Sequence, residues 1–260
     1  MPASAPAGSD LPRRILVLLD RESPRGPLEN VVYECCQMVL NYYGMLVEYR
    51  NVNEGPLPDN ETMAGFRGVI TAFSEGRIAE PARYLSWLLH QMEAGRKVIV
   101  LGPLGVKPYG HADFEIPRMV NAVYAGLGLR YEGAYTAVKP LLRYAHKDPQ
   151  GVEFERAYPA YPEVYERYTP TSPDLHIYLS VRRTDRPDSE SAVISTGPAG
   201  GFARIEYLRW MDPVTYTKQW YLNPFRFFRD ALDLEGVPAP DPTTLNGLRV
   251  AISHVDGDAF

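Results

Sequence analysis

The sequence contains little cysteine: its 2 cysteines, Cys35 and Cys36, are adjacent in a chain of 260 residues. An adjacent pair without further cysteines excludes a stabilising disulfide framework, a zinc site with the usual cysteine spacing and a CxxC redox motif. Both cysteines fall on the apolar stripe of a predicted helix. We therefore interpret them as core residues.

The sequence also lacks an excess of basic charge. It has 27 Lys and Arg against 32 Asp and Glu, which gives a net charge of −5. Nucleic-acid binding relies on clustered basic side chains that displace counterions from the phosphates. We therefore expect no nucleic-acid partner.

Long hydrophobic runs are absent as well. The apolar runs are short, such as residues 97–101, whereas a membrane-spanning helix needs roughly 20 apolar residues. The sequence therefore predicts no membrane span. Residues 1–11 lack the charged segment and apolar core of a secretory signal and have the composition of a linker between domains.

The first half of the chain alternates between apolar runs typical of buried strands and segments with helical spacing of apolar residues. With 45% hydrophobic residues, the chain can bury a substantial core. The pattern over residues 12–130 predicts an α/β fold with a doubly wound, mostly parallel sheet of the flavodoxin or Rossmann type. The predicted strands are 15–20, 45–49, 68–73 and 97–101, and the predicted helices are 28–43, 81–95 and one beginning at 113.

From about residue 131 the pattern changes to strands typical of antiparallel pairing. Residues 197–201 read Gly-Pro-Ala-Gly-Gly and predict a hairpin whose strands extend or cover the first sheet. A helix over 224–234 and a final strand over 248–255 follow. We divide the chain into the linker 1–11, a Rossmann-like domain 12–242 with a β extension from about 131, and the start of a further domain at 243–260.

The strongest chemical signal is Asp256-Gly257-Asp258, directly after the predicted strand 248–255. Carboxylates at i and i+2 can converge on one cation where a strand ends, and glycine allows the chain to turn sharply there. The alternative is an ordinary surface turn. His254 lies beside the motif and either contributes to this site or packs in the core.

Residues 248–260 resemble the opening strand and first motif of the polysaccharide deacetylase superfamily. The segment 220–234 and the order of domains resemble the middle region of Pel-type exopolysaccharide modification proteins, in which a Rossmann-like domain precedes the deacetylase. The resemblance implies that Asp256 is the general base and that Asp258 binds a divalent metal, with zinc expected in the complete protein. It also implies hydrolysis of N-acetyl groups on a polysaccharide of hexosamine, at a periplasmic or extracellular location.

The sequence departs from that family in one respect. The family completes its metal site with a His-x-x-x-His pair farther along the barrel, and none of the 5 histidines has that spacing. A catalytic zinc site usually has three protein ligands. We therefore expect this chain itself to bind no cofactor and to be inactive as an esterase. The histidines are His90, His111, His146, His176 and His254.

A second candidate is the glycine-containing turn Gly102–Gly105 after the predicted strand 97–101. Ligands collect at the carboxyl edge of open α/β sheets, although a purely structural turn is the alternative. This region also resembles class I glutamine amidotransferase-like domains, whose nucleophilic cysteine follows such a strand. Pro103 occupies the equivalent position here, which implies a non-catalytic relative. Residues 74–77 are either a polar binding loop or a solvated loop.

The 18 tyrosines suggest a carbohydrate-stacking surface, because sugar faces pack against aromatic rings. Tyr158, Tyr161, Tyr165 and Tyr168 either form such a surface or cover the edge of the sheet. Two functional hypotheses follow. The first is a non-catalytic accessory region of a multidomain, metal-dependent polysaccharide deacetylase. The alternative is a stand-alone α/β module that binds a ligand or carbohydrate at the 102–105 edge.

Overall fold

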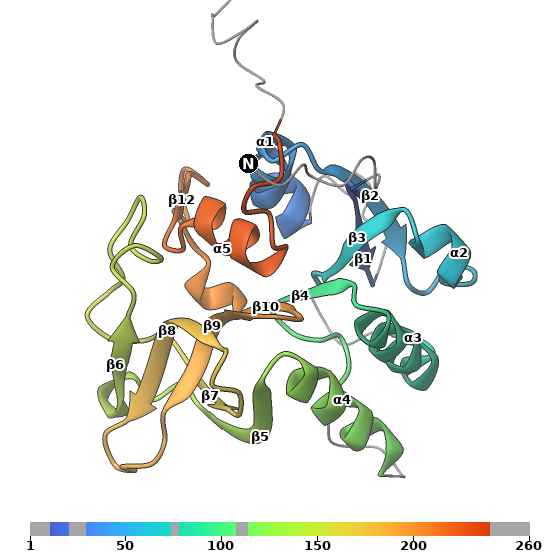
Figure 1. Ribbon diagram of the computed structural model, residues 1–260. Coiled ribbons are helices and arrows are strands. Elements are labelled where there is room, and N and C mark those ends of the chain that lie inside the picture. Colours follow the sequence, from blue (N-terminus) through green and yellow to red (C-terminus); the bar gives the residue numbers. More distant parts are fainter. Residues whose placement is uncertain (1–10, 21–29, 74–77, 108–113, 240–260) are drawn as a thin grey trace, which may run out of the picture.

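The computed structural model describes residues 11–20, 30–73, 78–107 and 114–239, and its centre is one 8-stranded sheet (Figure 1). Five neighbouring strands, β2, β1, β3, β4 and β10, run parallel, and the other three are antiparallel. The predicted α/β class, with a mostly parallel sheet and an antiparallel β extension, is confirmed. In sheet order the strands are β2 (Leu46–Asn51), β1 (Arg14–Leu19), β3 (Phe66–Thr71), β4 (Lys97–Leu101), β10 (Gly200–Ala203), β9 (Ser191–Gly197), β8 (His176–Arg183) and β6 (Leu142–Lys147).

Helices cover both faces of the parallel strands. Helices α1 and α5 contribute to one buried cluster, and helices α3 and α4 contribute to the other. The two clusters lie on opposite faces of the sheet, since Ile15 and Val17 of β1 join the first while Leu16 and Leu18 join the second. This two-sided burial is why β1 reads as a continuous apolar run. The helices are α1 (Gln37–Tyr42), α2 (Asn60–Met63), α3 (Pro81–Glu93), α4 (Glu115–Gly126) and α5 (Pro224–Ala231).

Smaller elements complete the described part of the chain. Two pairs of strands form separate two-stranded sheets, and three short helical turns connect the larger elements. The strand pairs are β5 (Leu129–Thr136) with β7 (Tyr165–Pro170), and β11 (Arg209–Met211) with β12 (Lys218–Trp220). The turns are η2 (Val32–Cys36), η3 (Lys139–Leu141) and η4 (Ile205–Tyr207).

The predicted glycine hairpin is confirmed, and it extends the first sheet. Gly197 lies opposite Gly200 in the β9–β10 pair, and β10 inserts between β9 and β4. Gly200 has φ +143°, and a Cβ there would collide with the backbone of Val98. Only glycine lets the hairpin approach β4 this closely. The hairpin thus joins the antiparallel strands to the parallel ones.

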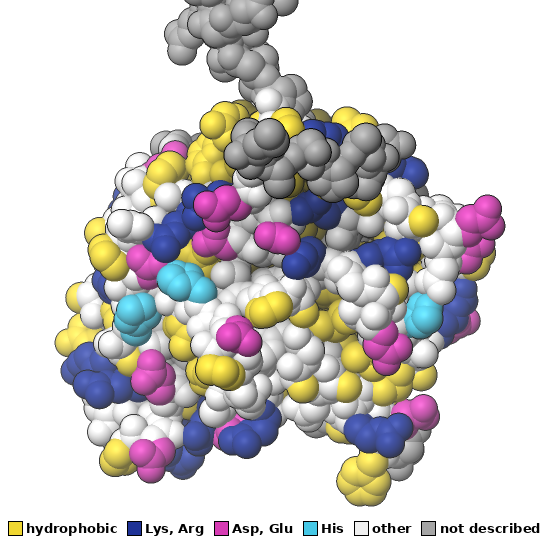
Figure 2. Space-filling model, viewed as in Figure 1, with side chains coloured by type: hydrophobic (Ala, Val, Ile, Leu, Met, Phe, Trp, Pro, Cys, Tyr) yellow, Lys and Arg dark blue, Asp and Glu magenta, His cyan; other side chains and the backbone are white. Residues whose placement is uncertain are grey.

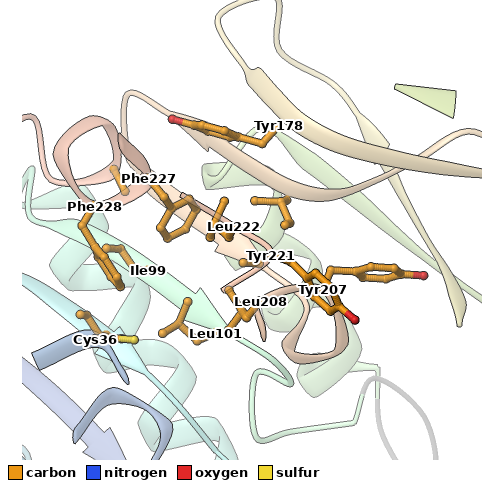
Figure 3. Packing of buried hydrophobic residues seen from close by; sticks show 14 of the residues in the cluster. Cys36, Ile99, Leu101, Tyr178, Tyr207, Leu208, Tyr221, Leu222, Phe227 and Phe228 are labelled. Carbon is orange, nitrogen blue, oxygen red and sulfur yellow. The ribbon is translucent and has the colours of Figure 1, made fainter. Parts of the chain in front are cut away.

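Helix α5 anchors the C-terminal part of the described chain to the sheet. Asn223 caps it by accepting a hydrogen bond from the Arg226 amide, and Pro224 occupies its first turn. Its inner face carries Phe227 and Phe228, which lie in the same buried cluster as Ile99 of β4 (Figure 3). The predicted helix 224–234 is therefore present, although it ends earlier, at Ala231.

The predicted helix 28–43 differs in its first turns. Residues 32–36 form a π-helical turn before α1, with the Gln37 amide bonded to the Val32 carbonyl. The wider turn shifts the side-chain stripe. Cys36 is buried, as expected of a core residue, but Cys35 is only half-buried.

The tyrosine-rich stretch covers the core and does not form an exposed surface. Tyr158, Tyr165 and Tyr168 are buried, and of the four only Tyr161 is exposed. The burial of those three favours the interpretation that they cover part of the sheet over that of an exposed carbohydrate-stacking surface. The predicted boundaries at 11, 242 and 243 remain predictions, and residues 243–260 lie outside the described residues.

Candidate functional site

A pocket of about 320 Å³ lies where β4 and β10 end, at the carboxyl edge of the parallel strands. Open α/β sheets bind ligands in crevices at this edge. The predicted turn at 102–105 forms one side of it. The described residues that line the pocket are Gly102, Pro103, Leu104, Val106, Lys107, Val120, Tyr124, Tyr131, Glu166, Tyr168, Arg204, Ile205 and Glu206.

Glycines shape the turn beside the pocket. Gly102 has φ +78° and donates its amide to the Ala203 carbonyl at 2.7 Å, which joins the ends of β4 and β10. Gly105 has φ +83°, and a Cβ there would clash with the ring of Phe73. Both glycines therefore have structural reasons to be glycine. The structural and ligand-binding interpretations of 102–105 are thus compatible, because the same turn borders a cavity.

Arg204 organises the charged wall of the pocket. Its guanidinium binds Glu206 through two hydrogen bonds, of 2.7 and 3.1 Å, and forms an ion pair with Glu166. The Arg204 side chain is only 13% exposed and that of Glu166 18%. A paired arginine of this kind is stiffly oriented, since bidentate bonding fixes the plane of the guanidinium.

Two tyrosine hydroxyls hold Glu166 from the other side. Tyr131 donates to one carboxylate oxygen at 2.8 Å and Tyr168 to the other at 2.9 Å. Burial raises the pKa of Tyr168 well above its usual value, so this hydroxyl stays protonated at neutral pH. The Glu166 carboxylate is therefore positioned by three neighbours before any ligand enters.

Stacked aromatic rings form the apolar wall. Tyr124 lies 5.7 Å from Tyr131 in a stacked arrangement and 5.2 Å from Tyr168, between ring centroids. Phe202 of β10 packs beneath them, 4.5 Å from Tyr168. Burial raises the pKa of Tyr124 to about 12. The pocket thus combines an aromatic wall with fixed carboxylate and guanidinium groups, a combination common in small-molecule sites.

The described part of the pocket differs from the active site of an amidotransferase-like enzyme with a nucleophilic cysteine. Pro103 is exposed at the turn after β4, where amidotransferase-like enzymes carry their cysteine. The described lining residues include no Ser, Thr, Cys or His. Pro103 therefore supplies no side-chain nucleophile at that position.

The residues predicted for a metal site are not among those that the structure describes. Asp256, Asp258 and His254, as well as the loop 74–77, are outside the described residues. Within the described ranges, no group of three His, Cys, Asp or Glu side chains could hold a metal ion. The prediction of a divalent metal remains untested.

Sequence reasoning missed the charged residues of the pocket. Glu166 lies on β7, whereas Arg204 and Glu206 follow β10, almost 40 residues later along the printed chain. No local motif connects them, because tertiary folding alone brings them together. The one available signal was Tyr168 in the tyrosine-rich stretch, two residues from Glu166 on the same strand.

Among the described residues, no helix is long and apolar enough to cross a membrane.

No family model and no curated protein matches this chain. Solved structures do resemble it at low identity. A ThuA-like protein from Bacteroides uniformis ATCC 8492 is 14% identical, with a TM-score of 0.41, over 76% of this chain and 82% of that one. A cytoplasmic protein from Salmonella typhimurium LT2 is 11% identical, with a TM-score of 0.47, over 86% and 99%. Another cytoplasmic protein from Salmonella typhimurium is 8% identical, with a TM-score of 0.40, over 72% and 85%.

These comparisons correct two predictions. The proteins that resemble this chain are described as ThuA-like or cytoplasmic, and not as polysaccharide deacetylases. The main prediction, an accessory region of an exopolysaccharide deacetylase, is therefore wrong, and so are the polysaccharide deacetylase and exopolysaccharide labels attached to it. The alternative of a stand-alone α/β protein fits better. The predicted periplasmic or extracellular location is also wrong by this comparison. The resemblance of residues 248–260 to the polysaccharide deacetylase superfamily itself stays a prediction, because these residues lie outside the described part of the chain.

Proposed function

We propose that this chain is an α/β binding module that holds a small, hydroxyl-rich molecule of the sugar or polyol class in the pocket between β4 and β10. The observation that carries the proposal is the Glu166 carboxylate, oriented by Arg204, Tyr131 and Tyr168 inside an aromatic-walled pocket. Fixed acceptors and donors of this kind recognise hydroxyl groups.

The chemistry of the wall supports this class. Hydroxyl groups both donate and accept, so they can donate to Glu166 or Glu206 and accept from Arg204 at once. The apolar face of a sugar ring can lie against tyrosine rings such as Tyr131, which is half-buried. The two carboxylates balance Arg204 and Lys107 in charge, which favours a neutral ligand over a strongly anionic one.

The size of the pocket also supports a small ligand. At about 320 Å³ it lies at the small end of ligand pockets, which span roughly 300–1,000 Å³. A single sugar ring matches this end of the range better than a nucleotide or a polymer segment. The preorganised side chains reduce the entropy cost of binding.

Titration calorimetry with a panel of neutral monosaccharides and polyols tests the proposal. We expect saturable binding by the wild-type protein, and the substitution Glu166→Gln should weaken it about 10- to 100-fold, because a charged acceptor is lost. The matched control is Glu132→Gln: Glu132 also lies in the β5–β7 region but does not line the pocket.

Circular dichroism of both variants establishes that they are folded. Absence of binding by the folded wild-type protein to every member of the panel would refute the proposal. Equal weakening by Glu166→Gln and Glu132→Gln would show that the ligand binds elsewhere.

A further inference from the structure

The two edges of the 8-stranded sheet differ in how well they resist pairing with another strand. Figure 1 places β2 at one end of the sheet and β6 at the other. An unpaired edge is open to a second chain unless bulges, prolines or like charges protect it. The edge strand β6 has such protection: its register shifts between Tyr144 and His146, and it carries Arg143 and Lys147.

The edge strand β2 has no such protection. Its register with β1 runs without a shift from the Arg14–Leu46 pair to the Leu19–Asn51 pair. It contains no proline, and its two charged residues, Glu48 and Arg50, have opposite signs. Mixed charges do not repel a second copy of the same strand in the way that like charges do.

The backbone of β2 has a regular outward pattern. The amides of Leu46 and Val52 donate to Arg13 and Leu19, at the start and end of β1. In a parallel pair, alternate residues direct both backbone groups to the neighbour. Those of Val47, Tyr49 and Asn51 therefore point away from β1, toward an edge that no described strand pairs with. The Asn51 carbonyl also accepts a hydrogen bond from the Glu54 amide at 3.2 Å, so the groups of Val47 and Tyr49 are the ones that remain for a partner strand.

We propose that two copies of this chain pair antiparallel through β2, around a two-fold axis at Tyr49. In this register Tyr49 faces Tyr49 of the partner subunit, and Glu48 faces Arg50 of the partner subunit. The outward backbone groups of Tyr49 meet as a hydrogen-bonded pair, and the opposite-charge pair between Glu48 and Arg50 arises twice by symmetry. A shift by two residues places Glu48 opposite itself or Arg50 opposite itself, which repels.

Exposed apolar side chains near the strand support the same pairing. Leu46 at the start of β2 is 64% exposed. The ring of Tyr33 lies 6.2 Å from that of Tyr49 and is 40% exposed, beside the proposed axis. Pairing of the strands buries part of this surface in both copies, which favours association. The result is one continuous sheet across the dimer.

Size-exclusion chromatography with light scattering tests the proposal. We expect a mass twice the 29.2 kDa of one chain at high concentration. Arg50→Glu puts like charges opposite each other twice and should weaken the dimer about 10- to 100-fold. Because Glu48 also pairs with Arg14 in its own chain, the restoring variant is the triple substitution Arg14→Glu, Glu48→Arg and Arg50→Glu, which keeps a pair between residues 14 and 48 and opposite charges across the axis, and it should restore the dimer. Arg182→Glu, an exposed charge reversal on β8, is the control and should leave the dimer intact.

Amide exchange measured by NMR at two protein concentrations locates the interface. We expect the amides of Val47 and Tyr49 to become protected as concentration rises, while those of Glu48 and Arg50, which face β1, stay unchanged. A monomer at all concentrations overturns the proposal, including one in which another segment of the same chain covers β2. So does a dimer that Arg50→Glu leaves intact or that the triple substitution fails to restore.

Discussion

Asp148 is a buried carboxylate that directly follows the edge strand β6. It is 8% exposed and accepts hydrogen bonds from the Gln150 amide at 2.9 Å and from the His176 ring at 2.8 Å. Arg226 lies 3.2 Å away. Although burial alone raises its pKa, these three partners lower the pKa of Asp148 below its usual value. The ionised form is therefore the one that the fold stabilises.

We predict that Asp148 makes the protein sensitive to acid. A carboxyl whose pKa is lowered in the folded state contributes stability that is complete above its unfolded pKa, about 3.9, and is lost as pH falls through the lower folded value. Asp148→Asn should reduce the free energy of unfolding by about 1–3 kcal/mol at pH 7. The difference from wild type should shrink below about pH 4.

Urea unfolding at a series of pH values measures this difference. Asp185→Asn is the control, because Asp185 also pairs with an arginine, Arg183, but lies in an exposed turn. Exposed pairs contribute little to stability. A constant difference between wild type and Asp148→Asn from pH 7 to pH 3 would contradict the prediction.

At the scale of the element, α5 contributes more to the fold than its 8 residues suggest. It packs on the same face as α1, and Arg67 of β3 donates hydrogen bonds to the carbonyls of Leu232 and Asp233 just after it. Arg67 thus joins the sheet to the residues that follow α5. The bulky Phe227 and Phe228 fill the space above β4 (Figure 3).

We predict that Phe228→Ala destabilises the protein by about 3–5 kcal/mol, because it leaves a cavity between α5 and the sheet that the surroundings fill only in part. Phe228 is 1% exposed. Phe114→Ala, at a residue that is 91% exposed, is the control and should change stability by less than about 0.5 kcal/mol. Chemical unfolding followed by tryptophan fluorescence gives both values, and similar costs for the two variants would argue against the packing described.

At the scale of the whole molecule, one cluster of buried side chains spans the parallel and antiparallel parts. It contains Ile15 and Ile70 from the parallel strands as well as Val181 and Ile194 from the antiparallel ones. On the surface shown in Figure 2, acidic and basic side chains are interspersed, with no broad region of one sign on that face. Shared packing, more than surface charge, holds the parts together.

We predict that the two parts of the sheet unfold together. Gly200→Ala disturbs the contact of β10 with Val98 and should destabilise the molecule by roughly 2 kcal/mol or more, in one transition. Gly95→Ala is the control: Gly95 also has a positive φ, +78°, but a Cβ there meets nothing within 4 Å. It should cost about 1–2 kcal/mol.

Far-ultraviolet circular dichroism and tryptophan fluorescence follow the two unfolding curves. Coincident curves for wild type and Gly200→Ala are the expected result. Two separate transitions, with only one shifted by Gly200→Ala, would show that the antiparallel strands unfold independently.

The sequence by itself determined the fold class and most elements of the parallel sheet. After a basic first residue, β1 and β4 are apolar at every position because both faces are covered, and the glycines at 197–201 specify a tight hairpin. These are local signals. The half-buried Cys35 and the short helix α2 were missed because a π-helical turn and a four-residue helix leave too weak a periodicity.

Only the tertiary structure decided the candidate site. Glu166, Arg204 and Tyr131 lie far apart along the chain, on β7, after β10 and on β5, and each is unremarkable in its own segment. The sequence pointed to the turn at 102–105 but not to the charged groups opposite it. Long-range strand pairing brings these side chains together, and no local spacing encodes such pairing, so the site emerges only when the sheet is assembled.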